Sequence, residues 1–474
     1  MLRQAYPGFV VMTARQAQTN VAELLAALRE AREHTLALVS DLNDKQLMGP
    51  RLGIVNPLRW EIAHVAWFQE FWLLRHLGGE PPILTIGDEL YDSARVAHDT
   101  RWDIPLLSRA DTLAYMREVL TRIADCCQRT DYLAFADASG YGAEYFLHLA
   151  LFHEQMHDEA FAYTRQTLGY PAPQFNEGVR VANLPLPGGR STEVQDGALR
   201  NNAPTSQRYP GDAHVPGGKF VLGRSAGPAF IFDNEQPAHQ VEIAPFSISK
   251  TAVANGEYLE FVKEKGHARR EFWSEAGWRW RENASAEYPV YWKRDGESWL
   301  HRNFDQWTDL ELNHAIIHVN WYEADAFCHW AGRRLPTEAE WEIAASAEPI
   351  ADRSGISNRR KYPWGNAPPT PDRANLDWHA MGCIDVRALP ASDSMFGCRQ
   401  MIGNSWEWTS TDFCPYPGFR AGPYREYSEP WFGDHKVLRG GCWATRSCMI
   451  TNTYRNFYTP DRRDVWAGFR TCAL

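Results

Sequence analysis

The stretch AEYFLHLALFHEQMHDEAFAYTRQTL, residues 143–168, decides the fold of the first part of this chain. Its apolar residues recur every three to four positions, which predicts an amphipathic helix with one face buried. Residues 21–42, 58–77 and 110–127 have the same spacing. Four long amphipathic helices in succession predict an all-α four-helix bundle at the N-terminus.

The character of the sequence changes once after these helices. Residues 182–216 are rich in Pro, Gly, Asn and Ser, which is typical of a linker. Short apolar runs at 217–223 and 239–253 then predict strands, a helix is predicted at 321–332, and a long tail rich in Gly, Trp and Pro predicts loops. We therefore expect a helical domain, a linker and an irregular α+β domain, at residues 1–181, 182–216 and 217–474.

Composition excludes several classes of function. The chain has 474 residues, more than one hydrophobic core usually organises, and a net charge of −10 that offers no basic surface for nucleic acid or anionic lipid. No apolar run approaches the length of a membrane span, and no export signal is evident. The nine cysteines form no C-x-x-C pair, so neither a disulfide framework nor a cysteine zinc site is indicated. We expect a cytoplasmic protein.

The run HEQMH, residues 153–157, matches the H-E-x-x-H pattern of zinc metalloproteases. His153 and His157 are four positions apart on a helix, so both rings lie on one face and can bind one metal ion. A protease would need Glu154 as its base and a third ligand. Ala160 and Tyr163 stand where the extended protease motif has Gly and His, and nothing in the sequence selects a downstream Glu. A pair of histidines with no metal is the other interpretation.

A third histidine is available on another predicted helix. His64 lies in the amphipathic stretch 58–77, among large aromatic residues. Metal sites in helical bundles are commonly built from side chains of facing helices. His64, His153 and His157 therefore form a candidate three-histidine set.

The two domains also resemble known families. The first resembles the DinB-like helical bundle. The second resembles the formylglycine-generating-enzyme or sulfatase-modifying-factor fold, a C-type-lectin-like α+β domain, through the stretches HVNWYEADAFCHWAGRRLPTEAEWEIAA, YPWGN, GNSWEWT, VLRGGCWAT, YRNFYTPDRR and GFR. Fused in this order, they are similar to the iron-dependent sulfoxide synthases of ergothioneine biosynthesis over nearly the whole chain. The closing run 455–474 resembles most the selenium branch of that group, the selenoneine synthases.

This resemblance implies a metal and its ligands. Its counterparts of His64, His153 and His157 bind Fe(II) on one face and leave three positions open, for the imidazole of hercynine, for a thiolate or selenolate, and for O2. Holding the reactants side by side is the purpose of such an open site. Glu159 becomes a partner that could fix the orientation of a histidine ring, and Glu154 is no longer needed as a base.

The resemblance also implies where hercynine binds. Asn456, Phe457 and Tyr458 match an Asn followed by aromatic residues that holds the betaine, and Tyr416 matches a tyrosine of a P-Y-P-G-F loop. Aromatic faces suit a trimethylammonium group, which attracts them by cation–π interaction and donates no strong hydrogen bond. Core packing is the alternative role for Phe457.

Two other motifs of the second domain give less specific evidence of function. Cys442 and Cys448 are displaced from the cysteine positions of formylglycine-generating enzymes, so formylglycine generation is not expected. Asn404 and Glu407 in GNSWEWT have two interpretations, a structural Ca2+ site or an aromatic loop lock without metal.

Two departures from the sulfur enzymes concern the chalcogen donor. Phe413 stands where enzymes that use γ-glutamylcysteine have a catalytic tyrosine, a role that Tyr416 or Tyr424 could have taken over. Arg95 and Arg101 remain from a run of arginines that binds a carboxylate-rich thiol, with Arg101 as a candidate substrate ligand. A less anionic donor, a selenosugar, fits these changes and would give a selenoxide on the way to selenoneine. The alternatives are a sulfoxide synthase that uses γ-glutamylcysteine or cysteine, and an inactive binding module.

Overall fold

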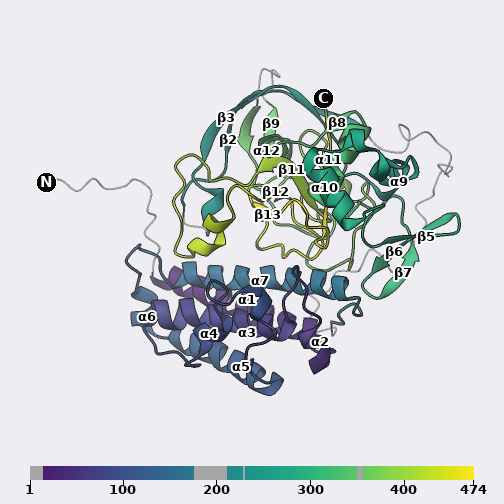
Figure 1. Cartoon of the computed structure of the whole chain (residues 1–474). Coiled ribbons are helices and arrows are strands. Elements are labelled where there is room, and N and C mark those ends of the chain that lie inside the picture. The colour runs from purple at the N-terminus through teal and green to yellow at the C-terminus, as the bar shows by residue number, and fades with distance from the viewer. Residues whose placement is uncertain (1–13, 176–210, 228–229, 350–355) are drawn as a thin grey trace. The chain divides into compact units, whose positions relative to one another are not determined.

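The computed structural model describes residues 14–175, 211–227, 230–349 and 356–474. The chain divides into two compact units, one formed by Met1–Ala182 with Ala226–Ile231 and the other by Asn183–Ser225 with Phe232–Leu474. Figure 1 shows helices in the first unit and mixed helices and strands in the second. The predicted architecture, an N-terminal all-α bundle followed by an irregular α+β domain, is confirmed.

The first unit is built on the four predicted long helices, α1 (Ala14–Val39), α3 (Leu58–Gln69), α5 (Arg109–Cys126) and α7 (Ala143–Leu168). α3 continues directly into the π-helix η1 (Glu70–Leu77), so the two together fill the predicted stretch. α1 packs against α7, and α3 contacts both α5 and α7. The shorter helices are α2 (Asp44–Met48), α4 (Gly87–Tyr91), η2 (His98–Thr100) and α6 (Thr130–Ala134).

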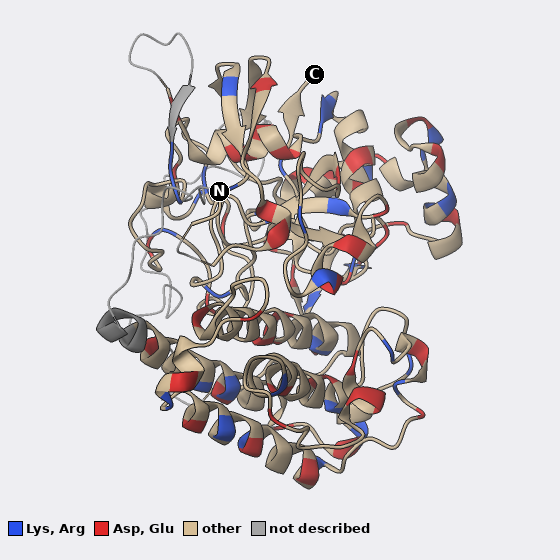
Figure 2. Cartoon of the chain, turned by 90° about the vertical axis from the view of Figure 1, so that its left-hand side faces the viewer, with Lys and Arg blue, Asp and Glu red and all other residues tan. Residues whose placement is uncertain are grey.

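The bundle core follows from the apolar periodicity of the helices. Leu28, Val65, Leu73, Val119 and Leu147 come from α1, α3, η1, α5 and α7, and all five are fully buried. α7 ends where Gly169 adopts a left-handed conformation with φ 65°, a conformation that glycine reaches without strain. Other charged residues are exposed, such as Glu118 and Arg122 of α5, and Figure 2 shows acidic and basic residues interspersed on the helices of this unit.

The second unit contains short elements joined by long loops. Its helices are α9 (Asn255–Lys263), α10 (Glu275–Ala284), α11 (Trp321–Trp330) and α12 (Glu338–Ser346), with 3-10 turns η3 (Asp233–Glu235), η4 (Gly266–Ala268), η5 (Arg270–Phe272), η6 (Pro390–Ser392), η7 (Arg425–Tyr427) and η8 (Glu429–Trp431). Its strands are β1 (Asp212–Val215), β2 (Gly218–Leu222), β3 (His239–Ile243), β4 (Phe246–Ser249), β5 (Trp292–Asp295), β6 (Ser298–Asn303), β7 (Gln306–Asp309), β8 (Arg333–Arg334), β9 (Ala347–Pro349), β10 (Ile356–Arg359), β11 (Trp406–Asp412), β12 (Lys436–Arg439), β13 (Asn456–Tyr458), β14 (Ala467–Gly468) and β15 (Cys472–Ala473).

Two four-stranded sheets organise these strands, with the orders β1-β4-β15-β8 and β13-β12-β11-β14. The remaining strands form the three-stranded meander β5-β6-β7 and the pairs β2-β3 and β9-β10. β13 pairs antiparallel with β12, which places Phe457 opposite Val437 and Asn456 opposite Leu438. Candidate substrate residues of the tail are therefore fixed by a sheet, although the sequence predicted only loops there.

Two boundaries differ from the expectation. β1 lies inside the segment predicted as a linker, whose residues 182–210 fall outside the described part of the chain. Ala213 and Val215 are buried and alternate with exposed residues, a strand pattern too short to stand out between Gly and Pro residues. The segment Ala226–Ile231 belongs to the first unit, where Phe230 packs against Tyr145 on α7 at 5.1 Å.

Among the helices that the structure describes, none is both long and apolar enough to cross a membrane. All nine cysteines lie in the described part of the chain, and no disulfide bond joins any two of them.

Candidate functional site

Three histidines meet inside the first unit. His64 comes from α3, and His153 and His157 come from α7. One ring nitrogen of each lies within 4.8 Å of the others, and their ring centroids are 4.6–5.1 Å apart. Within the described residues this is the one group of three or more His, Cys, Asp or Glu side chains that could hold a metal ion. The structure thus brings together the three predicted ligands.

Hydrogen bonds fix the orientation of two of these rings. His64 donates from Nδ1 to the carbonyl oxygen of Tyr91 at 2.7 Å, since a carbonyl can only accept. His157 Nδ1 lies 2.6 Å from Oε1 of Glu61, which is buried one helical turn before His64. With Nδ1 engaged, the lone pair of each ring is on Nε2, the usual arrangement of a metal-binding histidine.

Burial favours the neutral form of two of the three histidines, His64 and His153. Desolvation lowers the pKa of His64 well below its ordinary value, and neighbouring His157 and Arg101 lower it further, against the Tyr91 carbonyl that raises it. Desolvation likewise lowers the pKa of His153, with additional lowering by His157 and His64. Neutral imidazoles are the form that binds a metal. The donor set therefore fits a divalent transition metal that prefers nitrogen ligands.

Aromatic rings stack on two of the three histidines. Trp60 stacks on His64 with centroids 4.8 Å apart, and Phe68 stacks on His153 at 3.6 Å. Arg101, a predicted substrate ligand, lies with its guanidinium 3.8 Å from the Trp60 ring centre and donates to Asn56 at 2.6 Å. Burial lowers the pKa of Arg101 to about 10. In this position Arg101 braces the Trp60 side of the site, and its role toward a substrate stays a prediction.

Glu154, the acidic residue of the H-E-x-x-H match, is engaged elsewhere. Its carboxylate is fully buried and forms an ion pair with Arg32 of α1 at 2.7 Å. Gln69 and Thr35 donate to the same carboxylate at 2.5 and 2.9 Å. A protease base must be free to bind water, so these contacts favour a structural role for Glu154.

Glu159, the predicted partner of a histidine ring, is buried on α7. The carboxylate that holds His157 is that of Glu61, which the sequence analysis missed. The available signal was the spacing Glu61-x-x-His64, which places both side chains on one face of α3. That spacing did not identify the contact, because Glu61 accepts from His157 on a different helix and not from His64 on its own helix.

Several predicted substrate residues lie together in the second unit. Phe413 is fully buried and stacks on Phe457 with centroids 4.1 Å apart. Asn456 and Tyr458 flank Phe457 on β13, so their side chains point to the other face of the strand. All three β13 side chains are half-buried. Phe457 therefore packs on Phe413 and is only half-buried, so its role toward a substrate stays a prediction, while Asn456 and Tyr458 share a separate face.

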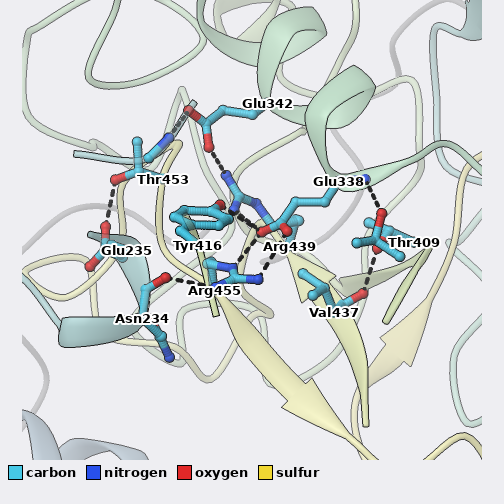
Figure 3. A network of polar contacts seen from close by, with 12 residues as sticks. Asn234, Glu235, Glu338, Glu342, Thr409, Tyr416, Val437, Arg439, Thr453 and Arg455 are labelled. Atoms are coloured by element: carbon cyan, nitrogen blue, oxygen red, sulfur yellow. Dashed lines mark hydrogen bonds and ion pairs between the residues drawn. The ribbon is translucent and has the colours of Figure 1, made fainter. Parts of the chain in front are cut away.

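Tyr416 belongs to a buried network of charges, drawn in Figure 3. Its hydroxyl donates to Glu338 at 3.1 Å, and the guanidinium of Arg455 lies 4.0 Å from its ring centre. Arg455 also lies 4.9 Å from the ring of Phe413, so the structure gathers both aromatic residues around one cation. Burial and Glu338 raise the pKa of Tyr416 well above its ordinary value, which keeps the phenol protonated. Whether Tyr416 also contacts a substrate stays a prediction.

The GNSWEWT residues are held by protein groups. Glu407 accepts from Arg470 at 2.6 and 2.8 Å and from Trp341 at 2.7 Å. Asn404 accepts from the Ile384 amide at 2.8 Å and from Asn375 at 3.1 Å. These contacts favour the loop lock over a Ca2+ site.

Comparisons with known proteins match both domains of the chain to known families. Residues 198–473 match the sulfatase-modifying factor enzyme 1-like domain, and residues 27–161 match the DinB superfamily. Hercynine oxygenase of Mycolicibacterium thermoresistibile is 36% identical over 95% of this chain and 94% of its own length, and that of Mycolicibacterium smegmatis is 35% identical over 93% and 96%.

Other similarities cover about half of the chain. Formylglycine-generating enzyme of Streptomyces coelicolor is 33% identical over 56% of this chain and 88% of its own length. Among solved structures, PvdO from Pseudomonas aeruginosa is 20% identical, covers 55% of this chain and 93% of its own, and has a TM-score of 0.37.

Proposed function

Because this chain belongs to the family of the hercynine oxygenases, we propose that it is a non-haem Fe(II) enzyme that uses O2 to oxidise hercynine. The bundle at 1–181 would carry the metal, and the domain at 217–474 would carry residues that recognise hercynine, with 182–216 between them. The observation that carries the proposal is the cluster of His64, His153 and His157, with two Nδ1 atoms already bound to acceptors.

The residues of the cluster fit an iron site in their chemistry. Three neutral imidazoles would hold Fe(II) and leave coordination positions for small molecules. Iron would supply the activation of O2 and a place where both substrates bind. The protein's own contribution is to hold the histidine tautomers through Tyr91 and Glu61, and to keep water away with Trp60 and Phe68.

Recognition of hercynine is assigned to the second unit. We propose that Asn456 and Tyr458 contact the betaine from the face of β13 opposite Phe457, and that Tyr416, which lies with Phe413 around Arg455, also helps to hold hercynine. An aromatic ring and an amide suit a trimethylammonium group beside a carboxylate. Nine cysteines without a disulfide bond among them fit a reducing compartment such as the cytoplasm.

We further propose that the second substrate is a selenosugar. The reaction joins selenium to C2 of the imidazole: the C–H and Se–H hydrogens and one oxygen atom of O2 leave as water, and the other oxygen atom forms the selenoxide. The support is Phe413, which offers no phenol where a thiol-using enzyme has one, and which is fully buried against Phe457. A selenolate is more acidic and more easily oxidised than a thiolate, so the need for such a phenol is weaker.

The second candidate is an ergothioneine-type sulfoxide synthase that uses γ-glutamylcysteine or cysteine. It is favoured by the identity to hercynine oxygenases along nearly the whole chain. One assay separates the candidates: purified protein loaded with Fe(II) receives hercynine, O2 and either a selenosugar or γ-glutamylcysteine, and the products are measured by mass spectrometry. A carbon–selenium product supports the proposal, and a carbon–sulfur product alone supports the second candidate. A protein that binds neither iron nor hercynine is a binding module of another kind.

A further inference from the structure

A basic cleft lies in the second unit, apart from the residues assigned above. It has a volume of about 320 Å³, and its lining comprises Arg224, Ser225, Arg359, Arg360, Lys361 and Asn366 with two threonines, Thr451 and Thr453. The lining contains four cationic side chains and no carboxylate. Such a concentration of positive charge stands out in a chain with a net charge of −10.

Only part of this charge is neutralised by neighbours. Arg359 lies 3.3 Å from Glu342, and Arg360 lies 2.6 Å from Glu348. Glu342 is shared with Arg439, another buried cation of the network in Figure 3. Within the part of the chain that the structure describes, Arg224 and Lys361 form no ion pair. Two cations of the cleft are thus available to a ligand.

The other polar groups of the cleft mostly offer hydrogen-bond donors. The Oδ1 atom of Asn366 accepts from the backbone amide of Lys361 at 3.0 Å, which leaves the NH2 group of Asn366 as a donor. The Thr453 hydroxyl donates to Glu235 at 2.5 Å and lies 3.0 Å from the Thr451 hydroxyl, so the two hydroxyls largely satisfy each other and Glu235. Guanidinium, ammonium and amide donors together select an oxyanion.

The backbone beneath these side chains is held in place. The Arg360 amide donates to Ser346 at 2.9 Å, and its carbonyl accepts from Asn452 at 3.1 Å. The Asn452 amide donates to the Lys361 carbonyl at 3.0 Å. Residues from three separate segments therefore converge on one preorganised cleft, which lowers the cost of ordering it around a ligand.

We propose that this cleft binds a small molecule through a doubly charged oxyanion, of the phosphate-monoester or dicarboxylate class. Two available cations match a charge of −2, and the volume lies at the lower end of small-molecule sites. The site is independent of the metal cluster and of the proposed reaction, since none of its lining residues belongs to either.

Titration calorimetry at constant ionic strength tests the proposal on the full chain. The probes are inorganic phosphate, phenyl phosphate and succinate, with chloride as the balancing anion. Arg224→Gln and Lys361→Gln should each weaken binding by about tenfold, and the double variant should abolish it, because each removes a charged donor. Lys219→Gln is the matched control, since this exposed lysine of β2 makes the same charge change outside the cleft.

Phenyl phosphate binding more tightly than succinate would identify a phosphate ligand, and the reverse order a dicarboxylate. Absence of binding to all three probes, binding unchanged in the double variant, or an equal loss in Lys219→Gln would overturn the proposal. A second measurement needs no variant: phosphate should slow acetylation of Lys361 in the wild-type protein, as read by mass spectrometry, while Lys219 reacts at an unchanged rate. Equal protection of both lysines also contradicts the site.

Discussion

A histidine ligates a metal through one ring nitrogen, so the partner of its other nitrogen decides which lone pair is available. His64 has a backbone carbonyl as that partner, and His157 has the carboxylate of Glu61. The backbone carbonyl of Tyr91 cannot be removed by a side-chain substitution, whereas the carboxylate of Glu61 can. Glu61 is therefore the residue at which support of the site is most directly measured.

We expect Glu61→Gln to weaken Fe(II) binding about 10–100-fold while the protein stays folded. An amide accepts a weaker hydrogen bond than a carboxylate and can present its NH2 group to the ring, which favours the wrong tautomer. Iron content after dialysis at graded Fe(II) concentrations measures the effect. His64→Ala, which removes a ligand, sets the scale of complete loss. A larger effect from Glu159→Gln than from Glu61→Gln would return the supporting role to Glu159.

A different pair of residues tests the hercynine pocket. Because Asn456 and Tyr458 share the face of β13 opposite Phe457, Asn456→Ala and Tyr458→Leu should raise the KM for hercynine while iron content is unchanged. Histidine, which lacks the three methyl groups, should be a poor substrate. Steady-state kinetics with both compounds provides the measurement. Equal use of histidine and hercynine by the wild-type protein would place the cation pocket elsewhere.

At the scale of helices, one buried ion pair ties α1 to α7 next to the histidines. Arg32 of α1 donates to Glu154 and also to Gln69 of α3 at 2.8 Å and to the Met116 carbonyl of α5 at 2.9 Å. One guanidinium of α1 thus contacts the other three long helices. The residue that made the sequence look like a protease is part of the bundle's internal structure.

We expect Glu154→Gln to lower the free energy of unfolding by about 3–5 kcal/mol, because it leaves Arg32 buried without its opposite charge. Urea unfolding measures the loss, and iron per folded molecule should stay close to wild type. Glu118→Gln on α5 is the control, since its pair with Arg122 is exposed and should contribute about 0–1 kcal/mol. Unchanged stability with lost turnover would instead mark Glu154 as a base.

The start of α9 offers a pH-dependent test in the second unit. Burial raises the pKa of Glu257 from 4.5 to about 7, although the Ala254 amide, which donates to it at 2.9 Å, and Arg333 oppose the shift. Because the pKa of Glu257 is higher in the folded state, the contribution of this group to the free energy of unfolding is fully present below pH 4.5. That contribution is lost as the pH rises through about 7.

Glu257→Gln should flatten this decline. The variant should match wild type near pH 4.5 and exceed it at pH 8 by an amount on the order of 1–3 kcal/mol. Thermal unfolding across the pH range, with Glu260→Gln on the same helix as the control, gives the comparison. A variant less stable than wild type at pH 8 would show that Glu257 is needed as a carboxylate.

For the whole molecule, periodicity predicted what depends on local sequence. The four long helices, the helix at 321–332 and the strands β2, β3 and β4 lie where apolar spacing placed them. The three histidines could be predicted as one ligand set, because two share a helix face and the third lies on a helix of the same bundle. The His157–Glu61 contact and the Arg32–Glu154 ion pair could not be predicted from the sequence, because each joins residues 96 or more positions apart.

The second domain shows the same limit. Its long loops carry few periodic signals, so β1 and β13 were missed, and the role of Tyr416 beside Glu338 and Arg455 depends on contacts 39 or more residues away. The stretches that resemble a known family carried the fold prediction there, and the local spacing of residues did not. Buried charge networks of this kind are specified by tertiary packing, which a single sequence does not display.

In the proposed function, Phe413 bears on a property of the whole enzyme, the choice of chalcogen donor. Its ring is fully buried, stacked on Phe457 and next to Arg455, so Phe413→Tyr would place a hydroxyl among aromatic rings and a cation. Wild-type protein should form a carbon–selenium bond from a selenosugar far faster than a carbon–sulfur bond from γ-glutamylcysteine, and Phe413→Tyr should not be required for turnover. Competition between the two donors in one reaction, resolved by mass spectrometry, gives the ratio of rates directly. A wild-type preference for the thiol, or a Phe413→Tyr variant that alone turns over either donor, would favour the second candidate, a sulfoxide synthase that uses a thiol.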